Sequence, residues 1–280
     1  MRMSEGLRLQ VLVAAVNADA RELAKKMNLQ TDALIVNQCD HFGVETFEHA
    51  GRSITCYSMA ERGVGLSRNT ALGRSNADII LFSDEDICLE NGYEKIIQKA
   101  FEDNEDADLL LFNLEVEPSR ATFYNTSKHR VHWYNYGRYG IVAAAVRREA
   151  ILRANLSFSL LFGGGARYSN GEDSLFFHDC LKKGLHLYTE TAKIGKEIPR
   201  ESTWFHGYSK KFFFDRGVLY AYLYGKMAKI WTLRYLLAKK KTVCAEIPFS
   251  KALRLMCDGI REGRNVRGGV LLENGTSMEE

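Results

Sequence analysis

The amino-acid sequence predicts an α/β protein with a mostly parallel central sheet flanked by helices and followed by a C-terminal helical extension. Short apolar runs typical of buried strands alternate with helix-like segments over the first two thirds of the chain. The 280 residues include only three prolines, and no cluster of them marks a linker. With 46% apolar and 26% charged residues, the composition is that of an ordinary globular protein and excludes disordered and collagen-like classes.

The elements can be justified in order along the chain. Residues 7–16 form an apolar run typical of a buried strand, residues 18–27 suit a helix, and residues 33–37 suit a second strand, which together make a βαβ opening. The further expected strands are 53–58, 78–82, 107–116 and 141–146, and the further expected helices are 66–74, 91–101, 147–154 and 172–183. Ligands bind at the carboxyl ends of parallel strands, so the polar clusters at 37–40, 83–86 and 163–173 should converge on one edge.

The cysteines and the N-terminal region predict a cytoplasmic protein. The six cysteines form no CxxC pair and are expected to be reduced thiols. The apolar stretch 9–16 is too short and too polar at its borders for an export signal. No run reaches the roughly 20 apolar residues that a spanning helix needs.

Two acidic clusters and one arginine are the candidate functional residues. Asp84 and Asp86, one residue apart after a buried strand, suit a divalent cation whose other positions are filled by diphosphate oxygens, although a solvated acidic loop is the alternative. Glu172 and Asp173 follow a glycine-rich loop at a helix start, where they either work in catalysis or only stabilise the helix dipole. Arg68, near the start of helix 66–74, can face an anionic ligand.

These motifs occur in an order that resembles a known family. The run GVGLSRNTALGRSNADIILFSDEDICLENGYEKI is followed by GGGARYSNGEDSLFFHDCLKKG. Residues 7–206 thereby resemble the inverting glycosyltransferases of family 2, which have the GT-A fold, of the type that builds bacterial cell-surface polysaccharides. Each piece alone is weak, but SRN, DED and GED in this order are a specific combination.

The resemblance implies a role for each matching residue. Asp84 would contact the donor's ribose and share a Mn²⁺ or Mg²⁺ ion with Asp86, which is the main metal ligand. Asp173 would be the general base that takes the proton of the acceptor hydroxyl, with Glu172 in support. Arg68 would lie on the nucleotide side of the pocket.

The chain departs from the family pattern at the first two strands. The family's first strand usually ends in an apolar-Pro-x-x-Asn segment and its second in paired aspartates, whereas here Asn17 follows the first strand and Asn37, Gln38 and Asp40 follow the second. These four residues are expected to bind the nucleotide, and the base is left open. His206 stands where many members of the family carry a late histidine near the metal or the diphosphate, so the resemblance implies a third metal ligand, with a packed core histidine as the alternative.

Residues 207–241 form a basic aromatic segment. Nine Lys or Arg and nine aromatic residues occur there against a single acid, Asp215. Such a segment docks on an anionic membrane surface or packs as helices with a wetted basic face, and nucleic acid is not an expected partner.

The sequence therefore predicts a metal-dependent inverting glycosyltransferase that moves a hexose from a nucleoside-diphosphate sugar, with UDP-sugar as the expected donor. The acceptor would be a hydroxyl of a saccharide or lipid-linked saccharide, and the enzyme would be cytoplasmic, at most peripheral on the inner face of the membrane. The alternatives are a sugar nucleotidyltransferase and a non-catalytic polysaccharide-assembly protein with the same fold. The expected domains are a catalytic domain at 1–206, the basic aromatic helical extension at 207–260 and a flexible tail at 261–280.

Overall fold

A computed structural model describes residues 6–117, 123–199 and 207–267. The chain divides into two compact units. The first comprises Met1–Arg167 and Glu172–Glu201, and the second comprises Tyr168–Gly171 and Ser202–Glu280. The second unit thus includes four residues, 168–171, that lie within the expected catalytic domain.

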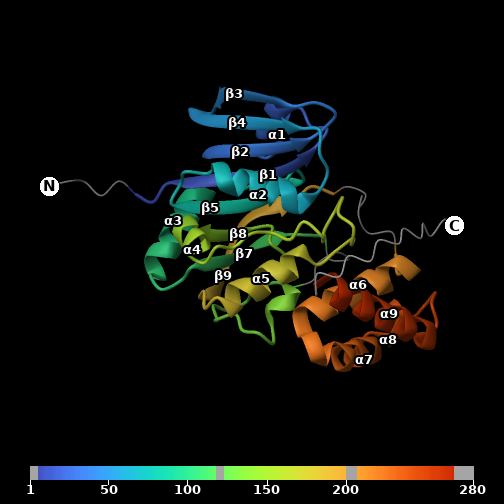
Figure 1. The fold of residues 1–280 in the computed structure, drawn as a ribbon. Helices are drawn as coiled ribbons and strands as arrows, with labels where there is room; N and C mark the ends of the chain where they lie inside the picture. The colour runs from blue at the N-terminus through green and yellow to red at the C-terminus, as the bar shows by residue number, and fades with distance from the viewer. Residues whose placement is uncertain (1–5, 118–122, 200–206, 268–280) are drawn as a thin grey trace. The chain divides into compact units, whose positions relative to one another are not determined.

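The first unit is built on one mixed sheet, which has nine strands within the described residues. Their order across the sheet is β3-β4-β2-β1-β5-β8-β7-β9-β6, and Figure 1 labels the strands from β3 to β9. The strands are β1 (Leu9–Val16), β2 (Asp32–Gln38), β3 (Gly43–His49), β4 (Arg52–Met59), β5 (Ile79–Asp84), β6 (Ile87–Leu89), β7 (Leu109–Glu115), β8 (Ala144–Arg147) and β9 (Leu187–Glu197).

Parallel pairing, as expected, holds for the neighbours β4-β2-β1-β5. The remaining pairs are antiparallel except β7 with β9, so the sheet as a whole is mixed. The four parallel strands are the ones that bring polar residues to a common carboxyl edge.

Helices cover both faces of this sheet because its strands alternate between two apolar cores. In β1, Val11 and Val13 face one core and Leu12 faces the other. The first core includes residues of α1 (Ala20–Lys26) and α3 (Tyr93–Asp103). The second includes residues of the remaining helices of this unit, which are α2 (Val64–Arg74), α4 (Arg148–Arg153) and α5 (Glu172–Lys182).

The sequence-based expectation missed three strands. β3 is an edge strand whose side chains are mostly exposed, so it lacks the apolar alternation that predicts a strand. β6 has only three residues and pairs with β9. β9 carries Lys, Thr and Glu between its apolar residues and is identified only by its pairing with β7.

The second unit is helical. Its helices are α6 (Lys210–Tyr224), α7 (Ala228–Ala238), α8 (Lys240–Val243) and α9 (Phe249–Arg267). α9 includes the first seven residues of the segment 261–280, for which the sequence predicts a flexible tail. No helix in the described part of the chain combines the length and apolar character needed to cross a bilayer.

α6 and α9 pack backbone against backbone. A Cβ added to Gly259 of α9 would collide with the carbonyl oxygen of Phe214, and one added to Gly217 of α6 would collide with that of Met256. A Cβ at Gly263, one turn after Gly259, would lie 2.8 Å from the Cβ of Ala221. The two helices can approach this closely only because these positions lack side chains.

The segment Tyr168–Gly171 belongs to this unit through its polar contacts. The backbone N–H and the hydroxyl of Ser169 both donate to a carboxylate oxygen of Asp215, at 2.8 Å each. Asp215 is 1% exposed and also forms an ion pair with Lys211 at 2.7 Å. The single acid of the basic aromatic segment is therefore a buried structural anchor.

Candidate active site

The carboxyl ends of the parallel strands converge as the sequence predicts. Val16 at the end of β1 lies in register with Gln38 at the end of β2, and Ala14 lies in register with Asp84 at the end of β5. The N–H of Asn17 donates to the carbonyl of Gln38 at 3.0 Å. These strand ends form the edge at which the candidate residues lie.

Arg68 of α2 is the centre of a cluster of acidic side chains. Its Nη2 contacts Asp84 Oδ1 at 3.2 Å, and its Nη1 contacts Glu172 Oε1 at 3.3 Å and Asp173 Oδ1 at 3.1 Å. The Arg68 side chain is 5% exposed, while those of Glu172 and Asp173 are 15% and 28% exposed. One buried cation thus fixes three carboxylates that come from two distant parts of the chain, and we call these four residues the Arg68 cluster.

Asp173 is held at both carboxylate oxygens. Oδ1 accepts from Arg68, and Oδ2 accepts from the backbone N–H of Ile141 at 3.1 Å. Its carboxylate therefore has a defined orientation while part of its surface remains exposed.

Aromatic rings support the Arg68 cluster. The ring of Phe158 lies 5.5 Å from the Arg68 guanidinium and stacks on Phe176 of α5 at 4.2 Å, and the edge of Phe82 packs against both. Because these rings exclude water from one side of the guanidinium, the charge interactions there are stronger than at an open surface.

Asn69 has a structural role that the sequence analysis missed. Its side chain accepts from the N–H of Phe158 at 2.7 Å and donates to the carbonyl of Phe158 at 2.9 Å. It therefore fixes the backbone of the loop that carries this ring. Two residues of the SRN motif therefore have different roles: Arg68 binds the acids, and Asn69 positions the ring of Phe158.

The glycine-rich loop packs closely against Glu172 and the start of α2. Gly163 has φ +103°, and a Cβ there would lie 2.7 Å from Val64 and 2.9 Å from the carboxylate carbon of Glu172. Gly165 has φ +78°, and its Cβ would lie 2.9 Å from the backbone nitrogen of Gly63. Glycine is needed at both positions for the loop to approach α2 and Glu172 so closely.

The crowding of acids changes their proton affinities. Burial and, second, the charge of Asp173 raise the pKa of Glu172 to about 7, although Arg68 opposes this. Burial also raises the pKa of Asp173 above its usual range, against the opposing effects of Arg68 and the Ile141 N–H. Burial lowers the pKa of Arg68, but Asp84, Asp173 and Glu172 raise it more, so the guanidinium stays charged. A carboxylate with a raised pKa is a stronger base than one in water.

Asp86, the expected metal ligand, lies two residues beyond Asp84 in the turn between β5 and β6. It is buried, and its carbonyl accepts from the N–H of Ile198 at 2.7 Å. Between the two aspartates, Glu85 points back to β1 and accepts from the N–H of Val16 at 2.8 Å. Two carboxylates fit the needs of a hard divalent cation that also binds diphosphate oxygens. His206, the expected third ligand, lies outside the described residues.

The residues expected to bind the nucleotide differ in how their side chains are used. Both ends of the Asn37 carboxamide bond to the backbone of Ala18, at 2.8 and 3.0 Å. The Gln38 side-chain oxygen accepts from the N–H of Gly63 at 2.7 Å. Asp40 and Asn17 are both exposed, and Asn17 is in a left-handed conformation with φ 50°. Asn37 and Gln38 therefore hold the loops of the strand edge, and Asp40 presents an exposed carboxylate.

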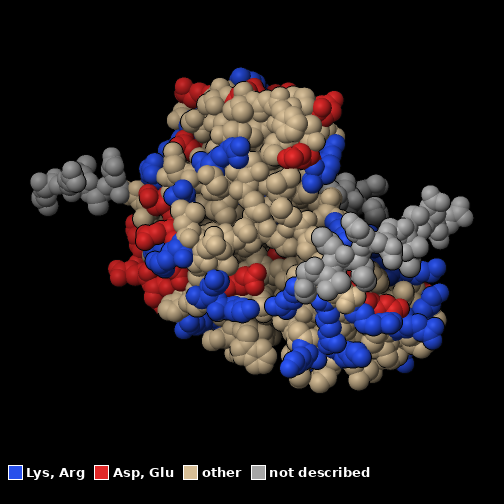
Figure 2. All heavy atoms as spheres, viewed as in Figure 1, with Lys and Arg blue, Asp and Glu red and all other residues tan. Residues whose placement is uncertain are grey.

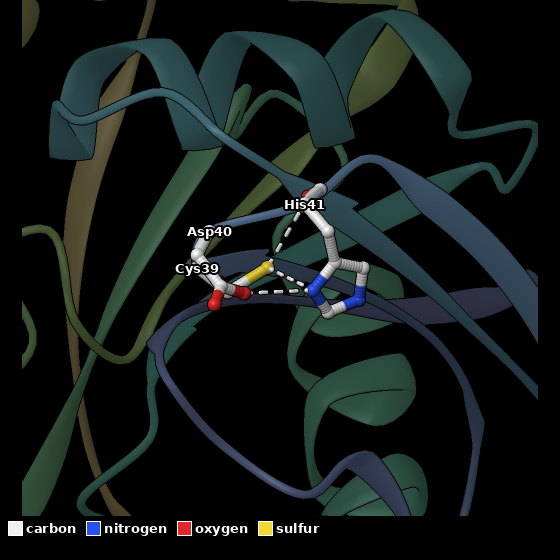
Figure 3. A group of neighbouring side chains, drawn as sticks. All are labelled: Cys39, Asp40 and His41. Carbon is white, nitrogen blue, oxygen red and sulfur yellow. Dashed lines mark hydrogen bonds and ion pairs between the residues drawn. The ribbon is translucent and has the colours of Figure 1, made fainter.

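Three consecutive residues of the kinds that bind metals follow β2, and their sequence pattern was not recognised as a candidate site. Figure 3 shows Cys39, Asp40 and His41 with their ligand atoms turned toward one another, all within 4.8 Å. His41 Nδ1 lies 2.9 Å from Asp40 Oδ1 and 3.6 Å from Cys39 Sγ. Burial of Cys39 and exposure of its two neighbours follow from the chain leaving the sheet here, and the contacts among these three consecutive residues account for their arrangement.

The structure is similar to crystal structures of TarS from S. aureus. It matches residues 1–349 of TarS in complex with UDP-GlcNAc with a TM-score of 0.62 and 12% identity, covering 94% of this chain and 92% of that chain. The same region of TarS in complex with UDP gives a TM-score of 0.60 at 12% identity, with the same coverage. A longer TarS chain gives a TM-score of 0.56 at 12% identity, covering 86% of this chain and 44% of that one.

No protein-family model and no curated protein sequence matches the chain. At 12% identity the likeness to TarS establishes the fold, and the expected GT-A-like fold is confirmed.

Proposed function

We propose that this protein is a metal-dependent inverting glycosyltransferase that transfers a hexose from a UDP-sugar to a hydroxyl of a saccharide or lipid-linked saccharide. The observation that carries the proposal is the Arg68 cluster, which holds two carboxylates with raised pKa values beside Asp84 at the strand edge. Two further observations support it. The fold is GT-A-like, and TarS, a glycosyltransferase of that fold, was crystallised with UDP-GlcNAc.

In the proposed reaction, Asp173 acts as the general base. It takes the proton of the acceptor hydroxyl as the acceptor oxygen bonds to the anomeric carbon, and the bond from that carbon to the diphosphate breaks with its electron pair leaving on the diphosphate. Displacement from the face opposite the leaving group inverts the configuration. Asp173 suits this role better than Glu172 because it is more exposed and its two oxygens are oriented by Arg68 and Ile141.

Arg68 and Glu172 are positioning residues in this scheme. Arg68 orients Asp173 without blocking its free surface, and Glu172 shares the charge of Arg68. If Mn²⁺ or Mg²⁺ binds, Asp86 and Asp84 would hold it, with His206 as a third ligand, and the ion would neutralise charge on the leaving diphosphate. Asp40, which is exposed, is the residue after β2 best placed to bind the uracil base, with Asn17, Asn37 and Gln38 shaping its surroundings.

The first alternative, a sugar nucleotidyltransferase, is disfavoured by the first βα turn. Such an enzyme binds a triphosphate with free backbone N–H groups at this helix start. Here the carboxylate of Asp19 already accepts from the N–H groups of Arg21 and Glu22, at 2.9 and 3.0 Å. A non-catalytic assembly protein is the second alternative, and an assay for transfer distinguishes it.

Donor identity can be tested by thermal stabilisation. A panel of nucleotide sugars should be measured with and without Mn²⁺, since a ligand at 100 times its Kd stabilises by about 2.7 kcal/mol. We expect a UDP-sugar to raise the melting temperature in a metal-dependent way. If no nucleotide sugar stabilises the protein and none is hydrolysed or transferred, the proposed function is wrong.

The base can be tested with Asp173→Asn. This variant should lower kcat by about 10² to 10⁴ while donor affinity stays within a few-fold. Asp179→Asn is the matched control and should retain its kcat, because Asp179 lies on the same helix α5 but its carboxylate contacts His178 at 3.1 Å and is not a member of the Arg68 cluster. Near wild-type turnover by Asp173→Asn would place the base elsewhere, with Glu172 as the next residue to test.

The metal ligand can be tested with Asp86→Ala. Calorimetric titration of UDP should show that this variant has lost the Mn²⁺ dependence of binding, whereas Asp103→Ala, an exposed acid at the end of α3, keeps it. An unchanged metal dependence in Asp86→Ala would refute the ligand assignment.

A further inference from the structure

Helix α7 carries an exposed apolar stripe. Met227, just before the helix, is 51% exposed, and Ile230, Leu233 and Leu237 are 59%, 44% and 60% exposed. Their spacing of three and four residues places them on one side of the helix. Ala228, Thr232 and Leu236, spaced by four residues, form a buried side. α7 is thus anchored by one face and presents a second apolar face to the surroundings.

Exposed cations flank this stripe. Lys226 precedes α7, Lys229 and Arg234 lie within it, and Lys239–Lys241 follow its end. All six are exposed. No Asp or Glu occurs in the sequence between Asp215 and Glu246. Figure 2 shows Lys and Arg gathered over the region of the C-terminal helices, with few acids among them.

The structure separates these cations from others of the basic aromatic segment. Lys211 is paired with Asp215, and the guanidinium of Arg216 lies 5.0 Å from the ring of Phe212 and 4.6 Å from that of Tyr235. These two cations stabilise the helical unit internally. The sequence shows nine equivalent cations, of which Lys210, Lys211 and Arg216 lie on α6. The other six, all exposed, lie on or beside α7 and α8, the helices next to the apolar stripe.

An exposed apolar stripe bordered by cations is complementary to one kind of surface. In an anionic bilayer the apolar side chains enter the boundary between headgroups and acyl chains, while Lys and Arg extend to the lipid phosphates. Nucleic acid would engage the cations but would leave Ile230, Leu233 and Leu237 in water. The combination therefore favours lipid over nucleic acid.

We propose that the face of α7 formed by Met227, Ile230, Leu233 and Leu237, with its flanking cations, docks the protein on an anionic lipid bilayer. This binding is separate from sugar transfer, because it uses none of the residues of the Arg68 cluster. Both kinds of contact are required, so binding should depend on apolar burial and on salt.

The test is co-sedimentation with vesicles of phosphatidylcholine alone and of phosphatidylcholine with phosphatidylglycerol. The wild type should bind the mixed vesicles at least tenfold more tightly than the neutral ones, and raising the salt should weaken binding at least tenfold. Two variants divide the surface: Ile230→Gln with Leu233→Gln and Leu237→Gln, and Lys226→Gln with Lys229→Gln and Lys239→Gln. Each should weaken binding at least tenfold.

The control replaces Phe42 and Val44, which are also exposed apolar residues but lie at the edge of the first unit, by Gln. This variant should bind vesicles as the wild type does, and circular dichroism should show that all variants melt as folded proteins.

The proposal is overturned if the wild type does not bind anionic vesicles, or if the triple Gln variant of Ile230, Leu233 and Leu237 binds them equally well. It is also overturned if that variant converts a dimer into a monomer with vesicle binding unchanged, which would assign the stripe to a second copy of this chain. A third result would also refute docking through the stripe. If RNA displaces the wild type from vesicles, and the Gln variant of Ile230, Leu233 and Leu237 binds RNA as well as the wild type does, only the cations contribute to binding.

Discussion

Replacing Glu172 by Gln should stabilise the protein by an amount that grows with pH. Burial, and then the charge of Asp173, raise the pKa of Glu172 from 4.5 to about 7. Between pH 4.5 and about 7, the Glu172 carboxyl is protonated in the folded protein but ionised in the unfolded chain. The free energy of unfolding of the wild type therefore falls as the pH rises through this interval. The stability that Glu172 contributes is therefore complete below about pH 4.5 and is lost as the pH rises through about 7.

The magnitude follows from the size of the pKa change. A rise from 4.5 to about 7, at about 1.4 kcal/mol per unit, corresponds to about 3 kcal/mol between the two protonation states. Because the Glu172 side chain is only 15% exposed, solvent screens little of this. The free energy of unfolding of Glu172→Gln relative to the wild type should increase by about 2 kcal/mol between pH 5 and pH 8.

Urea unfolding followed by circular dichroism at pH 5, 6.5 and 8 measures this difference. Glu22→Gln is the matched control, because Glu22 is also a first-turn acid but lies on the exposed surface of α1. The stability difference between Glu22→Gln and the wild type is the reference against which the pH dependence of Glu172→Gln is compared. The difference in free energy of unfolding between Glu172→Gln and the wild type should be larger at pH 8 than at pH 5. If it is equal at the two pH values, or smaller at pH 8, the pKa of Glu172 is not raised and the electrostatic reasoning for the Arg68 cluster fails.

Three further predictions, one of them with a paired control, test packing and charge. Arg68→Met should abolish transfer and destabilise the protein by about 3 to 5 kcal/mol above pH 7, measured by urea unfolding, since it leaves three carboxylates without their cation; a loss below 1 kcal/mol would contradict this. Asn69→Ala should cost about 1 to 3 kcal/mol in the same assay because both polar groups of Phe158 lose their partner, and an unchanged midpoint would count against the positioning role. Gly217→Ala should lower the free energy of unfolding by about 1 to 3 kcal/mol, because the added Cβ collides with the backbone of Met256. Gly73→Ala is the control: its Cβ meets nothing within 4 Å, and it should raise the free energy of unfolding by about 0.5 to 1 kcal/mol. Equal effects of the two substitutions would refute the close packing of α6 and α9.

The parallel part of the sheet could be predicted because its signal is local. β1, β2 and β5 are short apolar runs that end abruptly in polar residues, and this pattern is visible in any window that contains them. β3 and β9 could not be predicted in this way. Their stability comes from hydrogen bonds to a neighbouring strand, and their own side chains carry little information about the pairing.

The candidate site was predictable in its members more than in its arrangement. Asp84, Glu172 and Asp173 follow from motif types at strand and helix ends. The burial of Arg68 among them depends on contacts 16, 104 and 105 residues apart in sequence, and no local pattern encodes such distances. The family resemblance implies that Arg68 lies on the nucleotide side of the site, and the structure adds its ion pairs with three acids, which no motif indicates. Lys211 and Arg216 are a similar case. The composition counts both as surface cations, whereas Lys211 pairs with the buried Asp215 and Arg216 lies over the ring of Phe212.

The glycine contacts between α6 and α9 have a consequence for how this helix pair tolerates change. Where side chains meet, a helix can shift along its axis and neighbouring rotamers can adjust to a new fit. Gly217, Gly259 and Gly263 instead bring main chains together at fixed points. Moving α9 by a single residue would put Asp258 or Ile260 where Gly259 now meets Phe214, and Glu262 or Arg264 where Gly263 meets Ala221. The pair therefore has one alignment, and inserting or deleting one residue within α9 should be far more damaging than exchanging most of its exposed side chains.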